Sequence, residues 1–294
     1  MSRAGLRLLA AVLLTLGLCA GGCSDEEKTV RIATKPMTEQ FILGEMLRLL
    51  VEERTDLRVA LTKGVGGGTA NIHPAMVAGQ FDIYPEYTGT AWRYVLKLDG
   101  VPDMETLKTE YASRYGLRWI GLYGFNNTFA LAVRDTVARA RRLRSCSELA
   151  AMSPELVFGA EYDFYERDDG YAALIDVYGF RFKKAVDMDI GLKYPALASG
   201  DIDVMTIFTT DGRRSTAPLV MLRDDKGFFP SYHCGTVVRE VALRSHPQLE
   251  PVLHLLDGLL TDEDMAALNH QVEIGGQDER EVAKAFLRGK GLLR

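Results

Sequence analysis

The chain has few of the residue groupings that identify enzymes and metal proteins. Only four cysteines occur among 294 residues, and the five histidines are scattered, without a His-Glu-x-x-His pair. The glycine-rich stretch at 64–69 has neither the last glycine of a dinucleotide fingerprint nor the lysine of a P-loop. A Gly-x-Ser-x-Gly elbow is also missing. These absences argue against catalysis and against a bound cofactor or metal.

The chain also lacks a strong excess of either charge. Its formal net charge is −5, so no basic surface suggests nucleic acid as a partner. After the N-terminal region, no apolar run is long enough to cross a membrane. Charged residues make up 26% and hydrophobic residues 47%, as in ordinary globular proteins. The roughly 265 residues after the N-terminal region fit two lobes of about 130 residues each.

The N-terminus has the pattern of a secretory signal. Two arginines precede an apolar run at 8–18, and small residues then lead to Cys23. The run is too short to span a bilayer stably, so 1–22 is expected to be a signal peptide. A cysteine directly after Ala-Gly-Gly is typical of lipoproteins, and we expect a lipid on Cys23 and a tether over 23–28. The protein would then be exported and anchored on the periplasmic or outer face of the cell membrane. An ordinary cleaved signal with an incidental cysteine is the alternative.

Strand and helix patterns alternate in the first part of the chain. β-rich segments at 29–33, 57–61 and 81–84 are separated by helical patterns at 38–53 and 70–79. Such a βαβαβ order predicts a parallel sheet with helices on both faces.

A second α/β unit follows, and the chain then returns to the first. After a helix at 104–115, a strand at 129–133 is interpreted as leaving the first lobe. Crossings near 132 and 234 would form a hinge, with lobe 1 at 29–132 plus 235–294 and lobe 2 at 133–234. Ligands of open α/β sheets bind at the carboxyl ends of strands, so we expect a ligand cleft between the lobes. The remaining strands are expected at 156–159, 184–187, 204–208, 219–222 and 235–239, and helices at 170–178, 191–198, 247–260, 263–270 and 278–290.

Five sequence blocks carry a resemblance to one known family. They are Thr-Lys-Pro-Met-Thr-Glu-Gln-Phe-Ile-Leu-Gly-Glu-Met (34–46), Asp-Ile-Tyr-Pro-Glu-Tyr-Thr-Gly-Thr (82–90), Phe-Asn-Asn-Thr-Phe-Ala-Leu-Ala-Val (125–133), Thr-Thr-Asp-Gly-Arg (209–213) and Asp-Asp-Lys-Gly-Phe-Phe-Pro (224–230). Together they resemble the osmoprotectant-binding lipoproteins, the glycine betaine/choline/carnitine receptors of ABC importers. The resemblance implies a periplasmic-binding-protein-like (type II) α/β fold with a two-crossing hinge. It also implies a monomer without enzymatic activity or cofactor, which passes its ligand to the transmembrane subunit of an ABC permease.

The resemblance implies that an aromatic box holds the ligand's trimethylammonium group. Mapped onto this chain, the box consists of Tyr87, Phe129, Phe208 and Tyr232. A quaternary ammonium has no N–H to donate, and ring faces stabilise it by about 2 kcal/mol per desolvated contact. Core packing is the alternative, and it is the commoner role of a strand phenylalanine such as Phe129 or Phe208. We expect Tyr87 and Tyr232 in loops flanked by proline or glycine. The family usually has tyrosine at 129 and 208, which leaves a change in affinity or preference open.

The same resemblance assigns polar contacts to four other residues. Lys35, Thr90 and Arg167 match positions that hold the ligand carboxylate. An arginine can bind a carboxylate with two parallel hydrogen bonds, whereas a lysine supplies a point charge. Asn127 is placed where an oxygen can face the ammonium. Solvated loop or turn positions are the alternatives for Lys35, Asn127 and Arg167. Glu39, at the start of a helix directed at the cleft, either contacts the ligand or favours the helix dipole.

The predicted function is therefore the extracytoplasmic substrate-binding component of an ABC importer for glycine betaine or a related betaine. Lys35 and Arg167 favour a betaine over choline, because choline has no carboxylate to offset their buried charges. The same fold binding choline, carnitine or another trimethylammonium compound, such as a histidine-derived betaine, is the alternative. A periplasmic sensor and an exported enzyme are the readings outside this class. Whether Cys146 and Cys234 form a disulfide, which an exported compartment permits, stays open.

Overall fold

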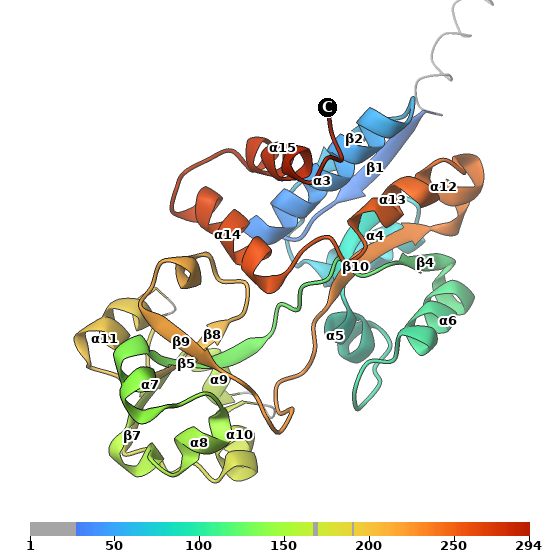
Figure 1. Ribbon diagram of the computed structural model, residues 1–294. Helices are drawn as coiled ribbons and strands as arrows, with labels where there is room; N and C mark the ends of the chain where they lie inside the picture. Colours follow the sequence, from blue (N-terminus) through green and yellow to red (C-terminus); the bar gives the residue numbers. More distant parts are fainter. Residues whose placement is uncertain (1–27, 167–169, 190) are drawn as a thin grey trace, which may run out of the picture.

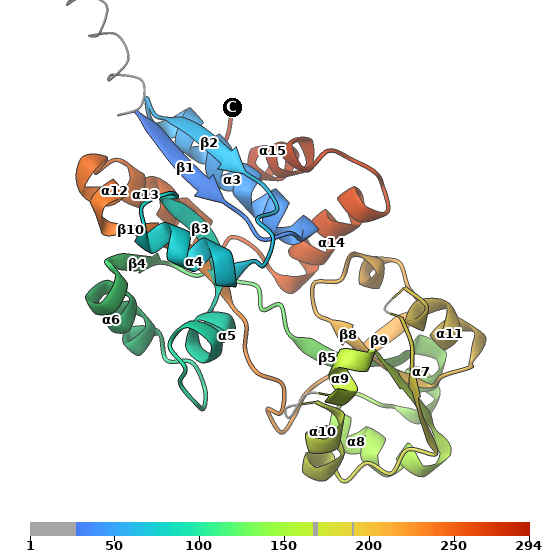
Figure 2. The same cartoon turned by 180° about the vertical axis from the view of Figure 1, so that it is seen from behind.

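The computed structural model describes residues 28–166, 170–189 and 191–294. These residues form two α/β lobes, each built on a five-stranded sheet (Figures 1 and 2). The expected signal peptide at 1–22, Cys23 and most of its tether, and Arg167 lie outside the described residues. None of the helices in the described ranges is both long and apolar enough to span a membrane.

The sheet of lobe 1 has the strand order β2-β1-β3-β10-β4. β1 is parallel to β2 and β3, and the helices α3 and α4 make the crossovers, as predicted. β10 enters from the C-terminal part of the chain and is antiparallel to β3 and β4. The bounds are β1 Thr29–Ala33, α3 Thr38–Arg54, β2 Arg58–Thr62, α4 Thr69–Val77, β3 Ile83–Tyr87, β4 Leu117–Ile120 and β10 Cys234–Arg239.

Successive residues of the central strands are buried on opposite faces of this sheet. Ile83 and Val238 join the core beneath α3, whereas their neighbours Tyr84 and Val237 join the core beneath α4 and α6. This alternation follows from the two-residue period of a strand, and it leaves the sheet covered on both faces (Figure 1). The other helical segments of lobe 1 are α5 Thr88–Thr90, η1 Ala91–Val95, α6 Met104–Tyr115, α12 Glu240–Ser245, α13 Leu249–Leu253, η4 His254–Leu256, α14 Asp262–Glu273 and α15 Glu279–Gly289.

The sheet of lobe 2 has the order β7-β6-β8-β5-β9. β6 is parallel to β7 and β8, while β5 is antiparallel to β8 and β9. The strands are β5 Phe129–Arg134, β6 Val157–Ala160, β7 Lys184–Asp187, β8 Val204–Phe208 and β9 Leu219–Leu222. The helical segments are α7 Asp135–Arg141, α8 Cys146–Ala150, η2 Ser153–Glu155, α9 Tyr162–Glu166, α10 Tyr171–Tyr178, α11 Lys193–Ser199 and η3 Gly212–Ser215.

Two segments, 121–128 and 223–233, connect the sheets and form the expected two-crossing hinge (Figure 2). An isolated antiparallel bridge between Asn126 and His233 holds them together. A boundary after residue 132 would divide β5, yet all of β5 pairs within the second sheet. The strand expected at 129–133 is present as β5, and its pairing with β8 and β9 puts it in the second sheet.

The two remaining cysteines lie in different lobes. Cys146 is buried in the core of lobe 2, Cys234 is buried in the core of lobe 1, and both are free thiols. Burial raises the pKa of the Cys146 thiol to about 12, so it stays protonated at neutral pH. Cys146 and Cys234 therefore do not form the disulfide that the sequence had left open.

A third contact between the lobes lies beside the hinge. The side chain of Asn269 on α14 donates a hydrogen bond to the Thr210 carbonyl at 2.8 Å, and His270 Nδ1 lies 3.0 Å from the Gly212 carbonyl. The 3₁₀ turn η3 of lobe 2 thus packs directly on α14 of lobe 1. A Cβ atom on Gly212 would lie only 2.7 Å from the backbone nitrogen of His270.

We expect Gly212→Ala to lower the free energy of unfolding by about 1–3 kcal/mol, because the added methyl group overpacks this contact. Urea or thermal unfolding measures the change. Gly289→Ala is the control, because nothing lies within 4 Å of a Cβ at this exposed helix end and alanine favours the helix. Equal stability of the two variants would contradict close packing of η3 on α14.

Candidate functional site

The residues predicted to bind the ligand lie at strand ends and in the hinge. Lys35 follows β1, Tyr87 is the last residue of β3, and Phe208 is the last residue of β8. Phe129 starts β5 directly opposite Phe208, because the two strands are antiparallel and these residues are paired in register. Asn127 lies in the first crossing. Strand ends of both lobes and the hinge therefore contribute to one region, as the fold class predicts.

Tyr87 is in a strand rather than in the expected loop. β3 continues through Pro85, where a break was predicted at residue 84. Its ladder with β1 ends at Ile83, so the missing N–H of Pro85 costs no bond on that side, and β10 pairs with β3 up to Tyr87. The side chain of Tyr87 is 5% exposed, and its hydroxyl donates a hydrogen bond to Glu39 Oε1.

Lys35 is buried and already paired with an anion. Its Nζ forms an ion pair with Glu86 Oε1 and lies 4.7 Å from the ring centroid of Tyr87. Glu86 is fully buried, and its second oxygen accepts a hydrogen bond of 2.6 Å from the Thr69 hydroxyl. A ligand carboxylate near Lys35 would therefore be a second anion at this ammonium group. Sequence reasoning missed Glu86, although it directly precedes Tyr87 in the second sequence block.

Phe129 and Phe208 form an aromatic pair on lobe 2. Their ring centroids are 4.5 Å apart with an interplanar angle of 35°, and Phe164 lies 5.4 Å from Phe129. Both phenylalanines are only partly buried. Partial exposure distinguishes them from the core residues around them, and it leaves apolar ring surface available to a ligand.

Thr90 and Tyr232 line a pocket of about 440 Å³ together with Lys35, here called the lobe 1 pocket. Tyr232 belongs to the second crossing and packs partly on the core of lobe 1. Its ring lies against Gly89, where a Cβ would come within 2.6 Å of Tyr232 Cε1, so a larger residue at 89 would displace the ring. The other lining residues are Gly67, Thr69, Ala70, Arg93 and Tyr94.

Asn127 and Phe208 line a second pocket, of about 430 Å³, which lies between the lobes and is here called the interlobe pocket. Asn127 Nδ2 donates to Glu39 Oε1 at 3.1 Å, so Glu39 joins the hinge to Tyr87. Burial raises the pKa of Glu39, and the hydrogen bond from Tyr87 is the largest opposing contribution. The other lining residues are Met37, Thr38, Glu39, Thr210, Asp211, Arg213, Asn269, Glu273 and Ile274.

The structure thus groups the predicted residues that it describes in two sets. Lys35 covers the ring of Tyr87 and shares the lobe 1 pocket with Thr90 and Tyr232. Phe129 is in ring contact with Phe208, which shares the interlobe pocket with Asn127. Glu39 accepts hydrogen bonds from both Tyr87 and Asn127 at the interlobe pocket. From the sequence, only a ligand contact or an interaction with the helix dipole was considered for this residue.

Two arginines at the pockets were not selected from the sequence. Arg93 lines the lobe 1 pocket, and Arg213 lines the interlobe pocket with its guanidinium carbon 5.7 Å from the ring centroid of Tyr194. Arg213 ends the fourth sequence block, which was the available signal. Either guanidinium can bind a carboxylate with two parallel hydrogen bonds.

Lobe 2 carries a buried ion pair that matches the one in lobe 1. Lys193 Nζ pairs with Glu161 Oε1, and the hydroxyl of Thr206 donates to Glu161 Oε2 at 2.7 Å. Burial lowers the pKa of Lys193, and the charge of Glu161 opposes that change. In each lobe, therefore, one carboxylate is bound by a buried lysine and a threonine hydroxyl near the end of a sheet strand.

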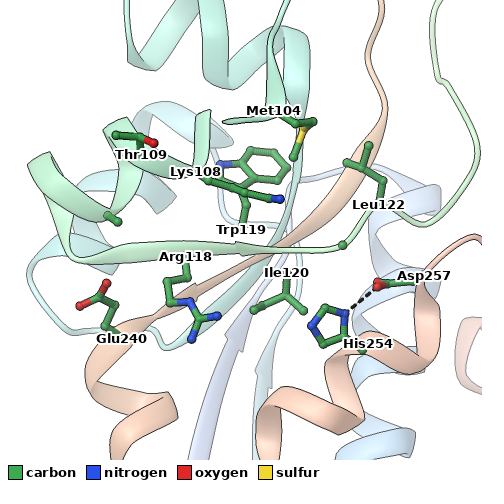
Figure 3. A pocket seen from close by; sticks show the side chains of 12 residues that line it. Met104, Lys108, Thr109, Arg118, Trp119, Ile120, Leu122, Glu240, His254 and Asp257 are labelled. Atoms are coloured by element: carbon green, nitrogen blue, oxygen red, sulfur yellow. Dashed lines mark hydrogen bonds and ion pairs between the residues drawn. The ribbon is translucent and has the colours of Figure 1, made fainter. Parts of the chain in front are cut away.

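A separate pocket of about 730 Å³ lies on lobe 1, along β4 between α6 and η4 (Figure 3). Trp119, Ile120 and Leu122 line it together with His254, whose Nδ1 lies 2.6 Å from Asp257 Oδ2. It contains none of the predicted ligand-binding residues. Within the part of the chain that the structure describes, no group of three or more His, Cys, Asp and Glu side chains is arranged to hold a metal.

Comparisons with known proteins agree with this geometry. Residues 28–289 match OpuAC, the substrate binding domain of ABC-type glycine betaine transport system. The chain is 44% identical, over 91% of its length, to the ergothioneine transport permease/ergothioneine binding protein EgtU of Helicobacter pylori strain G27, but it spans only 48% of that relative. It is 33% identical to the carnitine transport binding protein OpuCC of Listeria monocytogenes, with 98% of this chain and 97% of the relative covered.

A solved structure described as a glycine betaine/carnitine/choline ABC transporter superimposes with a TM-score of 0.85. It is 31% identical, and the match covers 90% of this chain and 99% of that one. This likeness confirms the expected periplasmic-binding-protein-like (type II) fold.

Proposed function

Because this chain belongs to the OpuAC family of substrate-binding domains of ABC-type glycine betaine transport systems, we propose that it is the extracytoplasmic receptor of an importer for a trimethylammonium betaine. The family and its relatives are binding proteins, so the chain is not an enzyme. Its partners are the small ligand and the transmembrane subunit of an ABC permease. A lipid on Cys23 holds it at the membrane as a monomer.

The observation that supports this proposal best is the partly exposed pair of Phe129 and Phe208, of which Phe208 lines the interlobe pocket. Apolar rings at the opening between two lobes fit a quaternary ammonium, which offers no hydrogen-bond donor of its own. Tyr87 and Tyr232 complete the aromatic box from lobe 1 and from the hinge. Closure of the lobes brings the two halves of the box together and expels water from the ligand.

The carboxylate of the ligand binds in this proposal to Thr90, Lys35 and Arg167, with Arg213 as an additional partner. Since Lys35 is already paired with Glu86, the arginines supply most of the attraction. Asn127 contributes from the hinge. In place of the predicted boundaries near 132 and 234, the proposed division puts residues 29–120 and 234–294 in lobe 1 and 129–222 in lobe 2, with the two crossings between them.

Ergothioneine is the second candidate ligand. The relative named for it is 44% identical to this chain, whereas the carnitine-binding relative is 33% identical. Ergothioneine is itself a trimethylammonium betaine, so it can use the same box and carboxylate contacts. It adds an imidazole-2-thione ring, for which the site must have room.

A thermal-shift panel tests the proposal. The purified full chain is heated with glycine betaine, proline betaine, carnitine, choline, ergothioneine or proline. A ligand at 100 times its Kd adds about 2.7 kcal/mol, which at about 2–4 °C per kcal/mol raises Tm by roughly 5–10 °C. We expect such shifts with betaines and none with proline. No shift with any trimethylammonium compound would reject the proposed function, and a larger shift with choline than with the betaines would reject the carboxylate contacts.

A further inference from the structure

Three buried side-chain oxygens at the interlobe pocket have no hydrogen-bond partner among the described residues. They are Glu39 Oε2, Asn127 Oδ1 and Asn269 Oδ1, and all three side chains line this one pocket. Glu39 is 3% exposed and Asn269 is 5% exposed. Leaving a buried acceptor unpaired costs about 1–3 kcal/mol, so an apolar group that fills this pocket and expels its water is disfavoured.

The orientation of both amides is set by bonds that their nitrogens already make. Asn127 Nδ2 donates to Glu39 Oε1 at 3.1 Å, and Asn269 Nδ2 donates to the Thr210 carbonyl at 2.8 Å. Turning either amide over would bring an oxygen against an oxygen in place of these bonds. The unpaired atoms are therefore acceptors, and the pocket offers them to a donor.

The carboxylate of Glu39 is the strongest of the three acceptors. Its Oε1 already receives the Tyr87 hydroxyl and the Asn127 amide, while Oε2 receives none. Burial raises the pKa of Glu39, and the hydrogen bond from Tyr87 to Oε1 is the largest contribution that opposes the rise. Phe208, which lines the same pocket, carries no hydroxyl, so it cannot satisfy these oxygens.

We propose that the interlobe pocket selects betaines that carry ring N–H donors, with Glu39 as the specificity-determining residue. This inference rests on the proposed function. A flat nitrogen heterocycle of the ligand packs on Phe208 and donates to Glu39, Asn127 and Asn269, while the aromatic box holds the trimethylammonium group. A site built to hydrogen-bond an N–H rejects an analogue that lacks it, because its buried acceptors then stay unpaired. Glycine betaine uses the box alone and leaves this pocket to water.

The trimethyl betaines of histidine and phenylalanine are matched probes for this inference. Both have the same ammonium, carboxylate and a flat ring, but only the histidine betaine has a ring N–H. Isothermal titration on the full chain should give a Kd at least about tenfold lower for the histidine betaine. In Glu39→Gln that preference should fall by at least about tenfold, and the Kd of glycine betaine, measured alongside, reports any shared loss that comes from Tyr87.

Three results separate this inference from the proposed function on which it rests. Equal affinity of the wild-type protein for the two ring betaines would overturn the inference and leave the proposed function standing. Equal weakening of all three betaines in Glu39→Gln would also overturn it, because Glu39 would then act only by positioning Tyr87. Failure of every betaine to bind the wild-type protein would reject both.

Two further variants secure the comparison. If Glu39→Gln does not fold, Glu39→Asp keeps the charge but withdraws it by one methylene, and it should reduce the preference in the same direction. Glu105→Gln, on the exposed face of α6, is the matched control and should keep the wild-type preference.

Discussion

Tyr232→Ala should weaken the binding of glycine betaine by at least about tenfold. A desolvated cation–π contact contributes about 2 kcal/mol, and every 1.4 kcal/mol changes Kd tenfold. The loss of stability should stay near 1 kcal/mol, because Tyr232 is only partly buried. Isothermal titration measures the Kd, and thermal unfolding of the unliganded protein measures the stability.

The control is Tyr232→Phe, which keeps the ring and removes only the hydroxyl. It should bind glycine betaine within about threefold of the wild-type protein, since the ring face supplies the attraction. Full affinity in Tyr232→Ala would remove this residue from the aromatic box. Tyr87→Ala is a poorer test of the box, because Tyr87 is 5% exposed and belongs to the core of lobe 1.

Glu161→Gln should lower the free energy of unfolding by about 3–5 kcal/mol, because it leaves the ammonium group of Lys193 buried without its anion. The side chain of Lys193 is 2% exposed, so water cannot replace the lost partner. Urea unfolding at neutral pH measures the loss. Glu105→Gln makes the same change in the exposed ion pair with Lys108, and it should cost no more than about 1 kcal/mol. Equal losses in the two variants would contradict the argument from burial.

The pH dependence of this loss has a definite sign. The pKa of Lys193 is lowered in the folded protein, and removing Glu161 lowers it further, whereas the unfolded chain keeps a value near 10.5. Between the two values the unfolded state binds more protons, so the free energy of unfolding rises with pH. The deficit of Glu161→Gln should therefore shrink as the pH approaches 10.5. A deficit that does not change with pH would show that the lost hydrogen bonds, rather than the charge, cause it.

The buried lysines explain how the lobes keep their site geometry without a ligand. Glu86 precedes Tyr87 and also accepts its backbone N–H at 2.6 Å, so the ion pair with Lys35 fixes the end of β3. In lobe 2 the strand residue is Thr206, two residues before Phe208, and its hydroxyl donates a hydrogen bond to Glu161. Each lobe thus presents its aromatic residue from a strand end that a buried charge pair holds in place.

Much of the fold could be predicted because local patterns decide it. The strands at 29–33 and 204–208 and the helix at 104–115 agree with the structure, because the spacing of apolar residues along a segment is a local signal of its secondary structure. The five sequence blocks placed the family correctly, and residues 28–289 match it. The expected aromatic pair at 129 and 208 is in contact because two antiparallel strands bring these residues opposite one another.

The tertiary structure decided the contacts between residues that are distant in sequence. Strand β3 runs through Pro85 because β10, from the C-terminal part of the chain, pairs with it along its length. Lys35 is not an unpaired cation because Glu86 lies beside it on the neighbouring strand. Glu39 is a buried acceptor only because the hinge and α14 close around it. Spacing along the chain predicts which residues share a helix or strand, but burial and charge pairing depend on elements that only the folded chain brings together.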